Sequence, residues 1–164
     1  MITIDPVLLA RAERLLATCR SKGLTLVTAE SCTGGMIAGI LTAIAGSSDV
    51  VDRGFVTYSN DAKAGVLDVP GDLLLAHGAV SEPVARAMAQ GALAQSAADL
   101  AVAVTGIAGP GGGSAEKPVG LVHLAAAARD GRLIHEQVVF PGDRAAVREQ
   151  TVVRALDLLE QIAA

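Results

Sequence analysis

The sequence contains very few aromatic residues: two Phe, one Tyr and no Trp make up 2% of its 164 residues. Proteins that bind single-stranded nucleic acids commonly stack the bases on aromatic side chains, so this scarcity argues against that class. The net charge of −4 and the pI near 5.3 also give no basic surface for DNA or RNA. The core must therefore be built from Ala, Val, Leu and Ile.

Long apolar runs are missing as well. Polar residues interrupt every stretch well before the 18 residues or so that a membrane-spanning helix needs. The N-terminal segment MITIDPVLLARAERLL lacks the basic start and the apolar stretch of a signal peptide. The only two cysteines, Cys19 and Cys32, do not have metal-ligand spacing. We therefore expect a cytoplasmic protein with reduced thiols, no metal and no cofactor.

A chain of this length most economically forms one domain, residues 1–164, large enough to bury a core. Apolar residues at helical spacing predict helices over 6–22 and 144–162, with Asp5 and Asp143 as N-caps. Further helices are expected from after Ser31 to near Gly46, after Asn60 as a cap, across PGDLLLAHG, and from Ser81 onward.

Strands are predicted at residues 24–29, 53–59 and 99–106 from their apolar, β-branched character. A late hairpin is predicted to turn at Asp130-Gly131, where both positions can take positive φ. Helices alternate with the early strands and the hairpin follows. This order predicts a three-layer α/β/α domain with a mixed sheet of about five strands.

Three polar or glycine-rich segments follow the predicted strands: 30–35, 58–63 and 105–113. In open α/β sheets, ligands bind outside the carboxyl ends of the strands. We therefore expect these segments to converge on one site.

Ser31 has two interpretations. Ser31 or Thr33 could simply cap the helix that follows. Alternatively, Ser31 is a nucleophile between a strand and a helix whose free N–H groups and dipole stabilise an oxyanion, with Gly34 and Gly35 allowing substrate to approach. The segment matches neither G-x-S-x-G nor S-x-x-K, so these residues alone leave both interpretations open.

A serine nucleophile needs a base. His77, His123 and His135 do not occupy natural positions for a catalytic triad. Lys63 is better placed, one turn into a helix after a strand end, but its pKa would have to fall from about 10.4 toward roughly 7–8. Otherwise Lys63 is a solvated surface lysine. Tyr58 could relay a proton or merely cover the strand end.

The segment TGIAGPGGG has the composition of a phosphate loop without the spacing of a P-loop or a dinucleotide-binding motif. A flexible loop and an anion-binding backbone both remain open. Arg144 and Arg148 share one face near a helix N-terminus, where positive charge opposes the dipole. A phosphate or carboxylate ligand would explain them, as would salt bridges to Asp143 or Glu149.

Five segments, in order, resemble the CinA C-terminal domain family: TAESCTGG, GFVTYSNDAK, GAVSEPVA, TGIAGPGGGSAEKPVG and FPGDRAAVR. The resemblance runs from about residue 5 to about residue 160. Characterised members of the family include stand-alone nicotinamide-nucleotide amidases. The sequence lacks the N-terminal molybdopterin-binding-like domain of full-length CinA proteins, so we expect its pyrophosphatase activity to be missing too.

The resemblance implies that the chain hydrolyses the carboxamide of nicotinamide mononucleotide to nicotinate mononucleotide and ammonia, without a metal. Ser31 would be the nucleophile, Lys63 its base and Tyr58 an aid to proton transfer. The implied substrate-binding residues are Glu30, Cys32, Thr33, Gly34, Gly35, Thr105, Gly106, Gly109, Arg144 and Arg148. Among them, the backbone N–H groups of 32–35 would hold the oxyanion, and Arg144 or Arg148 would suit the 5′-phosphate.

The family also suggests a homodimer or a higher homo-oligomer. The alternative function is a competence- or damage-related regulatory module that binds a nucleotide without catalysis. Hydrolysis of another small amide or phosphorylated ligand is a third candidate.

Overall fold

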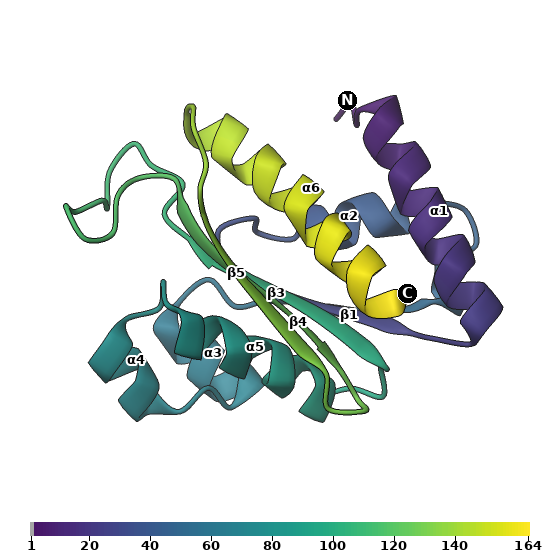
Figure 1. Ribbon diagram of the computed structural model, residues 1–164, viewed down its shortest axis with the longest axis horizontal. Coiled ribbons are helices and arrows are strands. Elements are labelled where there is room, and N and C mark those ends of the chain that lie inside the picture. The colour runs from purple at the N-terminus through teal and green to yellow at the C-terminus, as the bar shows by residue number, and fades with distance from the viewer. Residues whose placement is uncertain (1) are drawn as a thin grey trace.

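Two groups of helices cover opposite faces of one β-sheet in the computed structural model, which describes residues 2–164 (Figure 1). The strands of these residues are β1 (Leu26–Glu30), β2 (Val51–Val56), β3 (Leu100–Gly106), β4 (Leu121–Ala128) and β5 (Leu133–Val139). The helices are α1 (Pro6–Lys22), α2 (Met36–Thr42), α3 (Asn60–Leu67), α4 (Gly71–His77), α5 (Glu82–Ala94) and α6 (Arg144–Ala163), with a short 3-10 helix at Ser47–Asp49.

The sheet has the order β2-β1-β3-β4-β5. Strand β1 pairs in parallel with β2 and β3, whereas β3, β4 and β5 pair antiparallel. Helices α1, α2 and α6 lie on one face and α3, α4 and α5 on the other (Figure 1). The three-layer α/β/α fold with a mixed sheet and a late hairpin is therefore confirmed.

The two faces of the sheet carry side chains of different size. Toward α1 and α6, the central strands contribute branched residues such as Leu100, Val102 and Leu124. Toward α5, the same strands contribute alanines, including Ala101 and Ala125. The small side chains let α5 pack closely against β3 and β4, so the aromatic-poor chain still fills both layers.

Helix ends follow their sequence signals with one exception. The side chain of Asp5 accepts a hydrogen bond from the Val7 amide, and that of Asp143 accepts one from the Ala146 amide, as expected for N-caps. The prediction that Asn60 caps α3 is wrong. Ser59 is the cap, because its hydroxyl accepts from the Ala62 amide.

Helix α2 is shorter than predicted and stops at Thr42, after which the chain turns into the 3-10 helix. Strand β1 begins about two residues later than predicted, at Leu26, and strand β2 begins about two residues earlier, at Val51. These two residues pair with each other at the start of the strands. In the hairpin only Gly131 has positive φ, and the Ala128 amide donates to the Arg132 carbonyl. The connection is therefore longer than the two-residue turn that was expected.

The carboxyl ends of the three parallel strands, β1, β2 and β3, meet at one edge of the sheet. The segments that begin at residues 31, 57 and 107 leave the sheet there, as the sequence predicted. Along residues 2–164, the structure contains no helix with the length and hydropathy needed to cross a bilayer.

Candidate active site

The backbone around Ser31 is held by both neighbouring strands. The amide of Ser31 donates to the Val104 carbonyl of β3, and the Thr57 amide donates to the Glu30 carbonyl. The Ser31 side chain is 8% exposed and faces a cavity. Ser31 therefore leaves the sheet in a fixed position.

Helix α2 begins at Met36, five residues after Ser31, and its N-cap is Gly35, with a φ of +102° and no side-chain cap bond. Neither Ser31 nor Thr33 caps this helix. The capping interpretation is therefore wrong, and so is the expectation that Ser31 stands at the helix start. A connecting loop, residues 31–35, separates the serine from the helix.

The buried carboxylate of Glu30 takes over the capping role. Its Oε1 accepts from the Ile37 amide at 2.9 Å, and its Oε2 accepts from the Ala38 amide at 3.0 Å. Oε1 also accepts from the hydroxyl of Thr33 at 2.6 Å. Negative charge at a helix N-terminus is stabilising. We expected Glu30 to contact substrate, but its carboxylate is turned into the loop and the start of α2.

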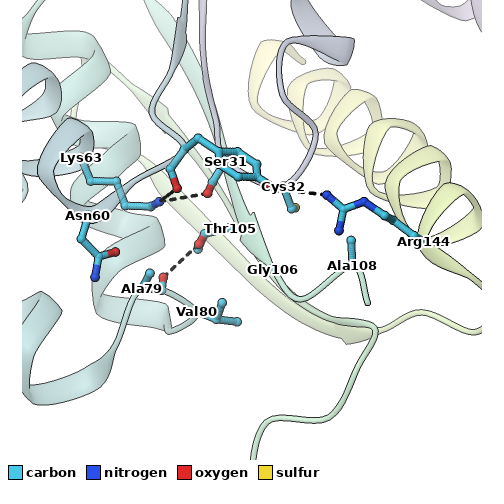
Figure 2. A pocket seen from close by; sticks show the side chains of 11 residues that line it. Ser31, Cys32, Asn60, Lys63, Ala79, Val80, Thr105, Gly106, Ala108 and Arg144 are labelled. Carbon is cyan, nitrogen blue, oxygen red and sulfur yellow. Dashed lines mark hydrogen bonds between the residues drawn. The ribbon is translucent and has the colours of Figure 1, made fainter. Parts of the chain in front are cut away.

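Lys63 is buried although it is a lysine, with 1% of its surface exposed. Its Nζ lies 2.9 Å from Oγ of Ser31 (Figure 2). The same Nζ lies 2.9 Å from the carbonyl oxygen of Thr57 and 3.3 Å from that of Tyr58. Burial lowers the pKa of Lys63, against a smaller opposing influence of Cys32. The geometry brings Ser31 and Lys63 together and excludes a solvated surface lysine.

A neutral Lys63 amine satisfies all three contacts. Its two N–H groups can donate to the carbonyls of Thr57 and Tyr58, which only accept. Its lone pair then faces the hydroxyl of Ser31 and can accept that proton. This is the arrangement a general base requires.

The thiol of Cys32 also lines the cavity, directly after Ser31 in the chain. Burial raises the pKa of this thiol to about 11, so it stays protonated at neutral pH. Of the two neighbouring nucleophile candidates, the serine hydroxyl is the one in contact with a base.

The phenol of Tyr58 points to Arg144 rather than to Lys63. It is 61% exposed, and its hydroxyl accepts a hydrogen bond from Nη2 of Arg144 at 3.1 Å. Nη1 of Arg144 donates to the Gly109 carbonyl at 3.0 Å. Tyr58 and Arg144 thus form one wall of the cavity, and only the carbonyl of Tyr58 faces the base.

Two residues at the end of β3 form the floor of the cavity. Oγ1 of Thr105 donates to the Ala79 carbonyl at 3.0 Å and so ties the loop before α5 to the sheet. A Cβ on Gly106 would lie 2.6 Å from Cγ2 of Val122, so only glycine fits there. Both residues line the cavity, and their implied contact with substrate stays a prediction.

Arg148 does not line the cavity of Ser31. Its Nε donates to the Cys32 carbonyl at 3.0 Å and its Nη2 to the Thr33 carbonyl at 3.1 Å. Within residues 2–164 neither Arg144 nor Arg148 forms a salt bridge, so the interpretation based on Asp143 or Glu149 is wrong. Their donors face carbonyls and the Tyr58 hydroxyl instead.

The cavity has a volume of about 200 Å³. Ser31, Cys32, Tyr58, Asn60, Lys63, Ala79, Val80, Thr105, Gly106, Ala108 and Arg144 line it (Figure 2). A second hollow of about 520 Å³ shares Ala108 and Arg144 with it and also reaches Arg148. Glu30, Thr33, Gly34, Gly35 and Gly109 were expected to bind substrate but do not line the cavity of Ser31.

Sequence reasoning missed Asn60, Ala79, Val80 and Ala108 as cavity residues. Asn60 lies between Tyr58 and Lys63 in the chain, which was the available signal. Ala79 and Val80 come from the loop before α5, and only the tertiary structure brings that loop to the site.

None of the three histidines lines the cavity of Ser31. Nδ1 of His123 lies 2.9 Å from Nε2 of His135, and the two rings stack. Burial lowers the pKa of His123 to about 4, so this ring is neutral at pH 7. Neither ring nor His77 lines the cavity, which agrees with the expectation of no histidine triad. Residues 2–164 contain no cluster of three or more His, Cys, Asp or Glu side chains suited to a metal ion.

The model of the CinA C-terminal domain family matches residues 9–163. The nicotinamide-nucleotide amidohydrolase PncC of Escherichia coli (strain K12) is 51% identical over 157 residues, which are 96% of this chain and 95% of that protein. The putative competence-damage inducible protein of Symbiobacterium thermophilum is 53% identical over 90% of this chain and 36% of that longer protein.

The crystal structure of competence/damage inducible protein CihA from Agrobacterium tumefaciens superposes with a TM-score of 0.97. It is 53% identical, and the match covers 100% of both chains. The chain therefore shares its fold, and 53% of its residues, with this competence/damage inducible protein.

Proposed function

Because the chain belongs to the CinA C-terminal domain family, we propose that it is a nicotinamide-nucleotide amidohydrolase acting on nicotinamide mononucleotide. The observation that carries this proposal is the buried contact between Ser31 and Lys63 at the cavity wall. The near full-length similarity to an amidohydrolase supports it. The reaction converts the carboxamide and water to a carboxylate and an ammonium ion.

In the first step, Oγ of Ser31 attacks the carboxamide carbon while its proton passes to Nζ of Lys63. A new C–O bond forms, and the carbonyl oxygen of the substrate becomes an oxyanion. The Lys63 ammonium then returns this proton to the substrate nitrogen. The C–N bond breaks, ammonia leaves, and an ester to Ser31 remains.

In the second step, water attacks the ester and gives a proton to the neutral Lys63 amine. Collapse of this intermediate breaks the bond to Oγ of Ser31, which takes the proton back from Lys63. The product is released as a carboxylic acid, which gives its remaining proton to the ammonia in solution and becomes a carboxylate, and the Ser31–Lys63 pair is restored. Lys63 thus acts as base and acid in turn, so no second titratable group is required.

The oxyanion needs hydrogen-bond donors fixed in advance. The N–H group of Gly34 donates to the Ser31 carbonyl and is already used. The N–H groups of Cys32 and Thr33 donate to no other residue among those the structure describes. We assign the oxyanion to these two amides, because they follow the nucleophile directly in the chain.

The two hollows share Ala108 and Arg144 in their walls, an arrangement that suits a substrate with a reactive ring and a distant phosphate. In the binding mode that we propose, the nicotinamide ring occupies the smaller cavity beside Ser31 and the ribose 5′-phosphate lies toward the wider hollow. Arg144 lines both hollows and is exposed, so it can reach an anion there. The small-molecule substrate is therefore consistent with the size and polarity of the site.

The test is release of ammonia from nicotinamide mononucleotide by the purified chain, without added metal. Ser31→Ala should abolish turnover, whereas Ser21→Ala, a change on the exposed side of α1, should leave it intact. Wild-type turnover by Ser31→Ala would exclude the serine mechanism. Saturable binding without any ammonia release would favour the regulatory module instead. The cytoplasmic location and the homo-oligomer stay predictions, to be checked by fractionation and by light scattering.

A further inference from the structure

Arg148 lies one turn after Arg144 on α6, yet the two guanidinium groups have different partners. We propose that Arg148 is a positioning residue that orients the loop amides around the oxyanion, and that phosphate recognition falls to Arg144 alone. This inference rests on the proposed amidohydrolase function and separates two residues that the sequence treated as a pair.

Both contacts of Arg148 are with the loop that carries the nucleophile. Nε and Nη2, two adjacent donors of the planar guanidinium, bind the carbonyls of Cys32 and Thr33. Hydrogen bonds from a charged donor are stronger than neutral ones, and a two-point contact also fixes orientation. Helix α6, near the C-terminus, therefore holds two consecutive peptide groups of the loop after Ser31.

Because each peptide group is planar and trans, the hydrogen bonds from Arg148 to the two carbonyls also fix the direction of the backbone N–H groups in the same peptides. In such a peptide the C=O and N–H bonds point in opposite directions. With its carbonyl directed to Arg148, the Cys32–Thr33 peptide turns the Thr33 N–H away from α6. The next peptide is fixed in the same way, and its Gly34 N–H closes the turn onto the Ser31 carbonyl at 3.1 Å.

Glu30 holds the same loop from the other side. Its carboxylate accepts from the Thr33 hydroxyl, so Thr33 is held at its side chain by Glu30 and at its carbonyl by Arg148. Glu30 and Arg148 do not touch each other, and each binds a separate part of the loop. The loop is thereby fixed before substrate arrives, as oxyanion stabilisation requires.

Arg144 has the opposite character. It is exposed, it lines both hollows, and its partners are the exposed phenol of Tyr58 and one carbonyl. An incoming phosphate can replace those partners without disturbing the loop of Ser31. Arg148 cannot turn its two loop-facing donors to a phosphate without releasing Cys32 and Thr33.

The first experiment compares nicotinamide mononucleotide with the phosphate-free nicotinamide riboside. Arg148→Gln should lower kcat by the same factor for both, roughly 100-fold, because a small displacement of the catalytic geometry has an effect of that size. Arg144→Gln should raise KM for the mononucleotide only. Arg154→Gln, a matched control on the same helix whose arginine pairs with Glu136, should change neither constant.

A raised KM for the mononucleotide alone in Arg148→Gln, with kcat unchanged, would overturn the proposal and assign Arg148 to the phosphate. Arg148→Lys retains one donor and should recover part of the lost kcat for both substrates. Absence of any recovery, in a variant with wild-type circular dichroism, contradicts a role based on loop orientation.

A second experiment does not depend on the nucleotide substrate. A small sulfonyl fluoride should label Ser31 in the wild-type chain, and Arg148→Gln should slow this labelling at unchanged thermal midpoint. If the wild-type chain is labelled but releases no ammonia from the mononucleotide, the proposed function is wrong. The labelling rates of the wild type and the variant then still decide whether Arg148 positions the loop. Equal labelling rates in the wild type and in Arg148→Gln exclude the positioning role. If the Gln variant does not fold, Arg148→Met, which also lacks the charged donors, takes its place in this comparison.

Discussion

Nζ of Lys63 lies 2.9 Å from Oγ of Ser31, and its remaining contacts are the backbone carbonyls of Thr57 and Tyr58. Within residues 2–164 no carboxylate pairs with this amine. Burial therefore lowers the pKa of Lys63, and only the smaller influence of Cys32 opposes this shift. In such a pair the serine can act as the nucleophile and the neutral lysine as its base.

The pH dependence of activity follows from that pKa. Only the neutral amine can accept the Ser31 proton, so kcat/KM should be low in acid and rise to a plateau as pH passes the lowered pKa. Lys63→Ala should reduce activity by at least about 100-fold and remove this rise. Ammonia release measured from about pH 5 to about pH 10 checks both statements. A flat wild-type profile would contradict the role of Lys63.

Lys63 also links stability to pH. Its folded-state pKa is lowered, whereas the unfolded chain has the ordinary value of about 10.4. Between these two values the unfolded state binds more protons, so the free energy of unfolding rises with pH across that window. Below the folded pKa, the penalty of burying the charge is fully present. The stability of the wild type relative to Lys63→Met should therefore increase with pH, as measured by urea unfolding. A difference that does not change with pH would exclude this linkage.

Tyr58→Phe tests whether the phenol relays a proton. Its hydroxyl contacts Arg144, and the base meets only the Tyr58 carbonyl, which the substitution retains. We expect kcat to stay near the wild-type value and KM for the mononucleotide to change by up to about fivefold, the equivalent of one hydrogen bond. Steady-state kinetics of the variant decide the matter. A kcat loss as large as that of Lys63→Ala would restore the proton-transfer role implied by the family.

Glu30→Gln should weaken the whole fold. Both carboxylate oxygens accept amides at the start of α2, and an amide side chain offers only one oxygen. Loss of a charged hydrogen bond and of the favourable helix-dipole contact should lower the free energy of unfolding by about 2–3 kcal/mol. Denaturant midpoints measure this. The exposed Glu149→Gln is the control, and an equal effect in both variants would show that Glu30 has no special role.

Two helical glycines should respond to alanine in opposite directions. A Cβ on Gly91 of α5 would overlap with the Leu67 carbonyl at the end of α3, so Gly91→Ala should destabilise the chain by about 1–3 kcal/mol. A Cβ on Gly65 of α3 would meet no other atom, so Gly65→Ala should stabilise the chain by about 0.5–1 kcal/mol. Thermal midpoints check both signs. A stabilised Gly91→Ala would refute the close packing of α5 on α3.

The sequence predicted most elements, because strand ends, caps and glycines are local signals. Those signals left the roles of Ser31 and Lys63 open, and only the resemblance to the family implied that they act as a pair. The role of Glu30 escaped prediction because its position beside Ser31 suggested a substrate contact, whereas its partners lie at Ile37 and Ala38 in the next helix. The contact of Arg148 with Cys32 spans 116 positions and has no local signature. Side chains that stabilise a site through tertiary contacts are the part that single-sequence reasoning cannot reach.

The placement of Tyr58 provides a built-in optical reporter. The chain has no Trp and only this one Tyr, whose hydroxyl is bonded to Arg144 at the mouth of the cavity. Ultraviolet emission of the folded protein therefore arises almost wholly from a single ring beside the site. Any ligand that draws Arg144 away from the phenol changes the emission of that ring, so occupancy can be followed spectroscopically without a label.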